Sequence, residues 1–201
     1  MLYSPRIQKP GSFAGQRGFS VVIVGPVGSG KTTELFRQLE RVEIAGGKVA
    51  LFKPHHDTRD EGVRTHGGFE RKAISIKDPE EIFDYLENDI TAIGIEEAQF
   101  LDNKICGVIR VLVLRGFQVI VVGLNLDFMA RPFGPVPVLM AQAEYVVKLQ
   151  AVCMNCGEDA SRTRRKTDAK EQVLVGGLDI YEPLCTACHE RWLSGSSQDE
   201  L

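Results

Sequence analysis

The stretch that decides the fold is GPVGSGKTTE (residues 25–34), which directly follows the apolar run FSVVIV (residues 19–24). It fits the pattern G-x-x-x-x-G-K-[ST] between a strand and a helix. Glycines let backbone N–H groups converge on a phosphate, and the following helix adds the positive end of its dipole. The pattern predicts a nucleoside triphosphate site in which Lys31 contacts the phosphates and Thr32 binds Mg²⁺. The alternative is a glycine-rich turn with a solvated lysine.

Apolar runs and helical patterns alternate along the chain. The runs at 21–24, 48–52, 92–95 and 117–122 are apolar apart from Lys48 and Gln118, as strands buried on both faces of a parallel sheet are. Helices are predicted at 32–43, at 79–87 with Asp78 as N-cap, and at 103–115. This alternation predicts a doubly wound α/β sheet with its ligands at the carboxyl ends of the strands.

Two acidic residues, Glu96 and Glu97, follow the third apolar run. Adjacent residues at the end of a strand point in different directions, so the two carboxylates can have different roles. We assign Glu96 to Mg²⁺, through water, and Glu97 to abstraction of a proton from an acceptor molecule. The alternative is a solvated acidic turn.

Charge and composition limit the partners. The formal net charge is −3, which gives no general attraction to nucleic acid or to an anionic membrane. No apolar segment resembles a secretory signal or reaches the length of a membrane span, so we expect a cytoplasmic protein. Both ends, residues 1–18 and 193–201, are expected to be disordered.

Four cysteines form two C-x₂-C pairs, Cys153 with Cys156 and Cys185 with Cys188. This spacing is typical of a structural zinc ribbon, with disulfides or a redox pair as the alternatives. A zinc ion there would hold both ends of residues 157–184, a segment that we call the lasso. The basic run 162–166 lies within it and is expected either to screen phosphates or to be a solvated surface. Cys106 is predicted to be a core thiol.

Six short motifs occur in an order that resembles thymidine kinases of the cellular, zinc-containing type. They are GPVGSGKTTEL (25–35), FKPHHDTR (52–59), IGIEEAQF (93–100), GLNLDFMARPFG (123–134), VVKLQAVCMNCG (146–157) and GGLDIYEPLCTACH (176–189). The resemblance covers residues 19 to 192.

The resemblance implies roles for individual residues. Glu97 would be the general base for the 5′-hydroxyl of thymidine, and Glu96 a water-mediated Mg²⁺ ligand. The ATP loop would consist of Gly25, Pro26, Val27, Gly28, Ser29, Gly30, Lys31, Thr32 and Thr33. Thymidine would be bound by Asp57, Arg59, Phe100, Leu124, Phe128, Phe133, Thr163, Val175, Gly176 and Tyr181. Such an enzyme is expected to be a homotetramer that its end product, thymidine triphosphate, inhibits.

The chain departs from the family pattern at five positions, one of which is Thr186, where the family usually has a basic or amide residue between the last two cysteines. The family usually has an aromatic residue at Gly28, methionine at Val27, aspartate at Glu96 and often aspartate at Asn125. Gly28 is expected to loosen the phosphate loop, Val27 to alter the sugar pocket and Glu96 to shift the Mg²⁺ geometry. None of these changes removes a group that the mechanism requires.

The predicted fold class is therefore α/β, with a P-loop (RecA-like) parallel-sheet domain at residues 19–150 and a small zinc-ribbon or lasso domain at residues 151–192. The predicted activity is transfer of the ATP γ-phosphoryl group to thymidine, without nucleic-acid or membrane partners. Two other functions remain open: a P-loop ATPase or helicase-like motor, and a zinc-ribbon nucleic-acid adaptor that binds through residues 162–166.

Overall fold

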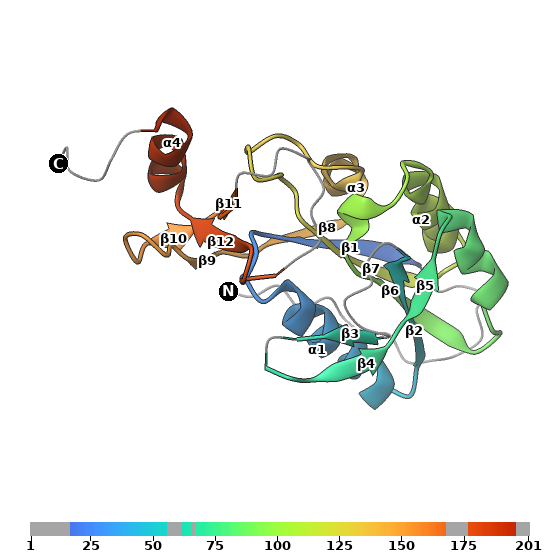
Figure 1. Cartoon of the computed structure of the whole chain (residues 1–201). Helices are drawn as coiled ribbons and strands as arrows, with labels where there is room; N and C mark the ends of the chain where they lie inside the picture. The colour runs from blue at the N-terminus through green and yellow to red at the C-terminus, as the bar shows by residue number, and fades with distance from the viewer. Residues whose placement is uncertain (1–16, 56–61, 66, 168–176, 196–201) are drawn as a thin grey trace.

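A six-stranded parallel sheet forms the centre of the computed structural model, which describes residues 17–55, 62–65, 67–167 and 177–195 (Figure 1). Its strands are β1 (Phe19–Val24), β2 (Lys48–Pro54), β5 (Ile74–Ile76), β6 (Ile90–Ile95), β7 (Gln118–Gly123) and β8 (Tyr145–Lys148). Their spatial order is β5-β2-β6-β7-β1-β8, and every pairing is parallel. The predicted α/β class is confirmed.

The four predicted strands all form, as β1, β2, β6 and β7, and their ends lie within two residues of the predicted runs. The two edge strands, β5 and β8, were not predicted. They have only three and four residues, and half of β8 is exposed, so neither carries a continuous apolar run. A further hairpin, β3 (Gly62–Arg64) with β4 (Glu70–Lys72), lies outside the main sheet.

Helices cover both faces of the sheet. They are α1 (Lys31–Ile44), α2 (Lys104–Leu114) and α3 (Val136–Gln142), with 3-10 helices η1 (Pro79–Tyr85) and η2 (Ala98–Phe100). Alternate residues of β1 enter different cores: Val21 and Ile23 pack with α1, whereas Val22 and Val24 pack with α2 and α3. This two-sided burial explains why successive residues in the middle of each central strand are apolar.

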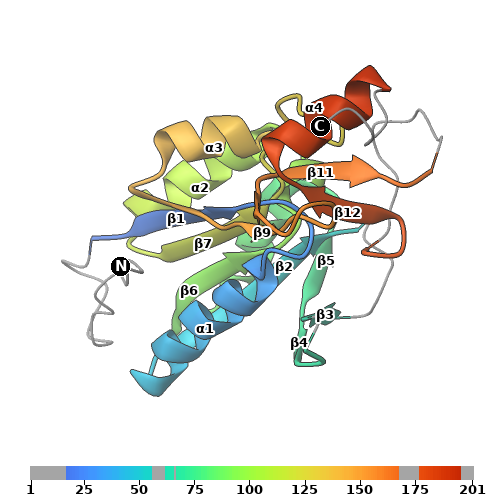
Figure 2. The same cartoon turned by 90° about the vertical axis from the view of Figure 1, so that its left-hand side faces the viewer.

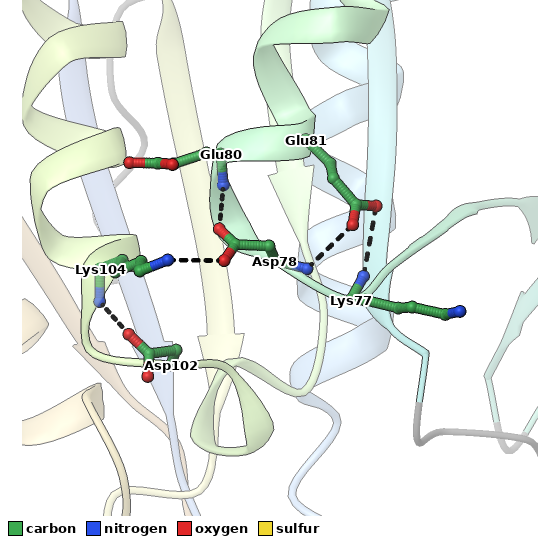
Figure 3. Close-up of polar contacts among 6 residues, drawn as sticks. All are labelled: Lys77, Asp78, Glu80, Glu81, Asp102 and Lys104. Carbon is green, nitrogen blue, oxygen red and sulfur yellow. Dashed lines mark hydrogen bonds and ion pairs between the residues drawn. The ribbon is translucent and has the colours of Figure 1, made fainter.

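The segment after Asp78 forms a 3-10 helix that ends at Tyr85 instead of the predicted α-helix over 79–87. The predicted N-cap is confirmed, because the Asp78 carboxylate accepts the Glu80 amide at 3.0 Å and the Glu81 carboxylate accepts the Asp78 amide at 3.2 Å (Figure 3). Lys104, at the start of α2, donates to Asp78 at 2.7 Å. This ion pair, together with the Glu80 amide, lowers the pKa of Asp78.

The C-terminal part of the chain forms a small module beside one end of the sheet (Figures 1 and 2). It contains the antiparallel pairs β9 (Ala151–Val152) with β10 (Asp159–Ala160) and β11 (Arg162–Arg165) with β12 (Tyr181–Leu184), followed by α4 (Thr186–Ser194). The basic run is therefore a strand with alternating burial. Thr163 and Arg165 are buried, at 4% and 2% exposure, so the solvated-surface interpretation is wrong for Arg165.

No helix among the described residues is long and apolar enough to span a membrane.

Candidate functional site

The phosphate loop connects β1 to α1, as the sequence pattern predicted. Gly28 and Gly30 have positive φ angles of 76° and 81°, a left-handed conformation that favours glycine. A Cβ at Gly28 would also lie 3.3 Å from the side chain of Leu178. Gly28 is one of the positions that depart from the family pattern. Glycine there fits both the left-handed backbone and the close approach of Leu178 from the lasso. Lys31 donates to the Pro26 carbonyl at 2.8 Å, so its ammonium group lies over the loop.

The sheet topology brings Glu96 to this loop from a strand that is not adjacent to β1. Strand β7 lies between β1 and β6, yet the Thr32 hydroxyl donates to Glu96 Oε1 at 2.5 Å. Glu96 is 5% exposed. All six strands are parallel, so their carboxyl ends meet at one edge, where Glu96 and the phosphate loop are both found.

The oxygens of Thr32 and Glu96 fit the requirements of Mg²⁺. They are hard ligands beside the N-terminus of α1, where the triphosphate oxygens are expected. Glutamate at this position reaches the Thr32 hydroxyl directly. The residues present therefore suit a Mg²⁺-nucleotide complex.

Glu97 adopts a left-handed conformation with φ 50° and ψ 41°, which is uncommon for a residue other than glycine. Its carboxylate accepts a hydrogen bond from Gln99 Nε2 at 2.5 Å, whereas that of Glu96 accepts one from the Thr32 hydroxyl. Backbone strain of this kind is concentrated at functional sites. The two neighbouring carboxylates thus contact different groups.

Gln99 is a site residue to which the sequence analysis gave no role. It is buried, and its Oε1 accepts the Leu124 amide at 2.9 Å while its Nε2 donates to Glu97. The Leu124 contact determines which end of the amide faces Glu97, because a backbone N–H can only donate. The sequence does show a side-chain amide, Gln99, two residues after the acidic pair. Its hydrogen bond to Leu124, which follows β7, could not be inferred from the spacing of the residues.

The segment 124–134, which we call the acceptor loop, follows β7. Asp127 shapes it: this buried carboxylate accepts the backbone amides of Met129 and Arg131, each at 2.9 Å. Phe133 is buried and packs edge-to-face against Phe100 with ring centroids 5.7 Å apart. The loop is therefore well anchored, and the roles of its aromatic residues stay predictions.

The C-terminal module contacts both the acceptor loop and the phosphate loop through β11. The Arg165 guanidinium lies 4.0 Å from the centroid of the Phe128 ring and donates to the Tyr181 hydroxyl at 2.8 Å. Two residues earlier, the Thr163 hydroxyl accepts the Val27 amide at 3.1 Å. Three predicted acceptor residues, Phe128, Thr163 and Tyr181, are thus linked by one strand pair. The sequence analysis did not single out Arg165 from its basic neighbours.

The predicted acceptor residues and the acidic pair fall into three groups. The acidic pair, Phe100, Leu124 and Phe133 lie together after β6 and β7, and Phe128, Thr163 and Tyr181 lie where β11 and β12 meet the acceptor loop. Asp57, Arg59, Val175 and Gly176 lie outside the described residues.

The four predicted cysteines come together as one cluster, with all Sγ atoms within 4.8 Å of one another. The Sγ atoms of Cys156 and Cys185 are 3.7 Å apart. Tetrahedral zinc with Zn–S bonds of about 2.3 Å requires sulfur separations of about 3.8 Å. The donor set and its geometry therefore fit a structural zinc ion, and none of the four cysteines forms a disulfide.

Hydrogen bonds prepare one of these thiols as a ligand. Burial raises the pKa of Cys153, but backbone amides, led by that of Cys185, outweigh this effect and lower the pKa to about 6. A thiol with this pKa is mainly thiolate at neutral pH, the form that binds metal. Asn155 and Arg191 also donate to the sulfur of Cys188, at 3.1 and 3.5 Å. Such outer contacts orient metal ligands.

Comparison with known families agrees with this site. A family model described as "Thymidine kinase" matches residues 18–189, which is most of the 201-residue chain. The match includes the phosphate loop, the acidic pair, the acceptor loop and all four cysteines. The chain therefore belongs to the thymidine kinase family, and its four-cysteine cluster identifies it as an enzyme of the zinc-containing, type II group.

Proposed function

We propose that this enzyme transfers the γ-phosphoryl group of ATP to the 5′-hydroxyl of thymidine, with Mg·ATP on the phosphate loop and Glu97 as the general base. One observation carries the proposal. At the same edge of the sheet, Glu96 contacts Thr32 of the phosphate loop, whereas the neighbouring Glu97 is directed to Gln99 and the start of the acceptor loop. This arrangement suits a donor on one side and an acceptor on the other.

The donor side would use the phosphate loop from Gly25 to Thr33. Its backbone N–H groups and the N-terminus of α1 stabilise negative charge, and Lys31 exchanges its contact with the Pro26 carbonyl for phosphate oxygens. Bound Mg²⁺, held by Thr32 and by Glu96 through water, would neutralise charge on the β- and γ-phosphates. Thr32 and Glu96 are already in contact, so little rearrangement is needed.

The acceptor side would use Phe100, Leu124, Phe128, Phe133, Thr163 and Tyr181 around the base and sugar, together with Asp57, Arg59, Val175 and Gly176. Aromatic side chains suit a planar base. The acceptor loop and β11 hold several of these residues in one place. Glycine at position 176 allows the main chain to approach a ligand closely.

In the reaction, the 5′-oxygen of thymidine forms a bond to the γ-phosphorus while the bond from that phosphorus to the β-phosphate oxygen breaks. Glu97 accepts the hydroxyl proton as the new bond forms, and ADP leaves with the electrons of the broken bond. Gln99 keeps the Glu97 carboxylate oriented during this transfer. Closure of the lasso would exclude water, so that ATP is not hydrolysed instead.

An assay with three mixtures tests this function. The purified enzyme is given Mg·ATP alone, Mg·ATP with thymidine, and Mg·ATP with single-stranded DNA, and both ADP and thymidine monophosphate are measured. We expect ADP and thymidine monophosphate in equal amounts, and only in the second mixture. ADP release stimulated by DNA would instead support the motor, and salt-sensitive DNA binding without turnover would support the adaptor.

Two further properties belong to the proposal. We expect a homotetramer, which sedimentation or light scattering can measure. We also expect thymidine triphosphate to inhibit by placing its base in the acceptor site and its phosphates toward the phosphate loop. Both are expectations that the family resemblance supports.

A further inference from the structure

His189 is a buried polar side chain for which the proposed mechanism has no use. It lies in the first turn of α4, next to Cys188, and is fully buried. Among the described residues, the group that could hold a metal ion consists of the four cysteines, and His189 is not part of it. Its position after the last cysteine suggests a ligand, but its ring is directed elsewhere.

The ring of His189 contacts the acceptor loop instead. Its Nε2 lies 2.9 Å from the carbonyl oxygen of Phe128, which is 61 positions away in the sequence. A carbonyl can only accept, so Nε2 carries the hydrogen and donates it. The ring also packs against Trp192, with centroids 5.2 Å apart, and its Nδ1 has no hydrogen-bond partner in the part of the chain that the structure describes. Within the described residues, the hydrogen bond of the ring is therefore directed at Phe128.

Phe128 is held from two sides by the C-terminal module. His189 of α4 binds its carbonyl, and Arg165 of β11 lies over its ring. The first turn of α4 also carries Cys188, and Cys185 is its N-cap residue. Any displacement of this turn would reach the Phe128 backbone through a single side chain.

We propose that His189 is a positioning residue for the acceptor: its hydrogen bond transmits the position of the zinc-binding turn to the backbone of Phe128 and so sets the affinity for thymidine. The inference rests on the proposed role of Phe128 in binding the nucleoside. It predicts that the metal cluster acts on the acceptor loop through α4, in addition to holding the ends of the lasso.

Three substitutions separate the hydrogen bond from simple packing. His189→Gln keeps a donor at about the reach of Nε2, whereas the donor of His189→Asn lies at about the place of Nδ1 and falls short of Phe128. His189→Phe keeps a ring against Trp192 but has no donor. The exposed neighbour Glu190 supplies the control Glu190→Gln, which lies on the same helix without this contact.

The measurements are zinc per chain, the dissociation constant of thymidine by calorimetry, and the KM values of thymidine and ATP. For His189→Asn and His189→Phe we expect the thymidine dissociation constant and KM to rise about tenfold, the effect of losing one shielded hydrogen bond. The KM of ATP and the zinc content should stay at the wild-type level. His189→Gln should recover thymidine binding to within about threefold of wild type, and Glu190→Gln should match wild type.

Four results would overturn the inference. Unchanged thymidine affinity in both His189→Asn and His189→Phe would show that the hydrogen bond to Phe128 does not set the affinity. Loss of zinc, or an equal rise in the KM of both substrates, would show a general structural role, and failure of His189→Gln to recover binding would point to packing. Failure of the proposed function is distinguishable, because wild-type enzyme would then form no thymidine monophosphate.

Discussion

Replacement of Glu97 by glutamine tests the chemistry most directly, because the structure determines how the new amide must lie. Gln99 Oε1 accepts the Leu124 amide, so Gln99 presents its Nε2 donor to residue 97. In Glu97→Gln the side-chain oxygen must accept this bond, which directs the NH₂ group away from Gln99. The introduced amide would then donate toward the acceptor hydroxyl and could not take its proton.

The expected loss follows from the role of a general base. A positioned base contributes about 10²- to 10⁴-fold to the rate, or about 3 to 5 kcal/mol of transition-state stabilisation. The fold should survive, because the Gln99 hydrogen bond and the side-chain volume are kept. We therefore expect kcat to fall by about 10²- to 10⁴-fold while thymidine binding changes less than about tenfold.

The assay is formation of labelled thymidine monophosphate at saturating Mg·ATP, with thymidine affinity measured separately by calorimetry. The matched control is Glu96→Gln, which alters the neighbouring carboxylate on Thr32. It should raise the KM of Mg·ATP and be partly rescued by high Mg²⁺. Near-normal turnover of Glu97→Gln, or an exchange of the two phenotypes, would refute the division of roles between the carboxylates.

Four other predictions follow from the structure. Gln99→Met should lower kcat about tenfold, because Glu97 loses its donor and a buried amide loses its acceptor; steady-state kinetics will test this, and unchanged kcat would contradict it. Elemental analysis should find one zinc per chain, and chelation or Cys185→Ser should abolish thymidine binding and shift the emission of Trp192, the only tryptophan, to longer wavelength before the sheet domain unfolds. Thymidine triphosphate should compete with thymidine in initial-rate measurements, and lack of inhibition at millimolar concentration would count against the proposed acceptor site. Asp78→Ala should lower the melting temperature by a few degrees at neutral pH. Because the folded-state pKa of Asp78 is lowered, its charge-dependent contribution is present above the ordinary value of 3.8 and is lost as the pH falls through the folded-state pKa, so the difference in melting temperature from wild type should shrink there.

Much of the framework could be predicted because it depends on local sequence. The phosphate loop requires left-handed glycines and a following helix within ten residues, and these are adjacent in the chain. The central strands are buried on both faces, which leaves uninterrupted apolar runs. Asp78 caps the helix that begins at the next residue. The cysteine spacing likewise predicted a cluster that the fold brings together.

The strand order was decided by tertiary structure. Two parallel strands can pair at any separation in the chain, so sequence did not reveal that β7 separates β1 from β6. The short edge strands β5 and β8 depend on neighbours for their pairing and have weak patterns of their own. The burial of Arg165 also depends on partners elsewhere, since its sequence neighbours are basic and polar.

The contacts that organise the site could not be predicted from the sequence either, because they also join residues that are far apart in the chain. Gln99 meets Leu124 across 25 positions, and His189 meets Phe128 across 61. A side chain and a backbone group at such distances leave no joint signal in a single sequence, because a backbone amide or carbonyl is present at almost every position. Sequence therefore determined which chemical groups this thymidine kinase has, while the packing of β7, β11 and α4 around one edge of the sheet decided which of those groups touch.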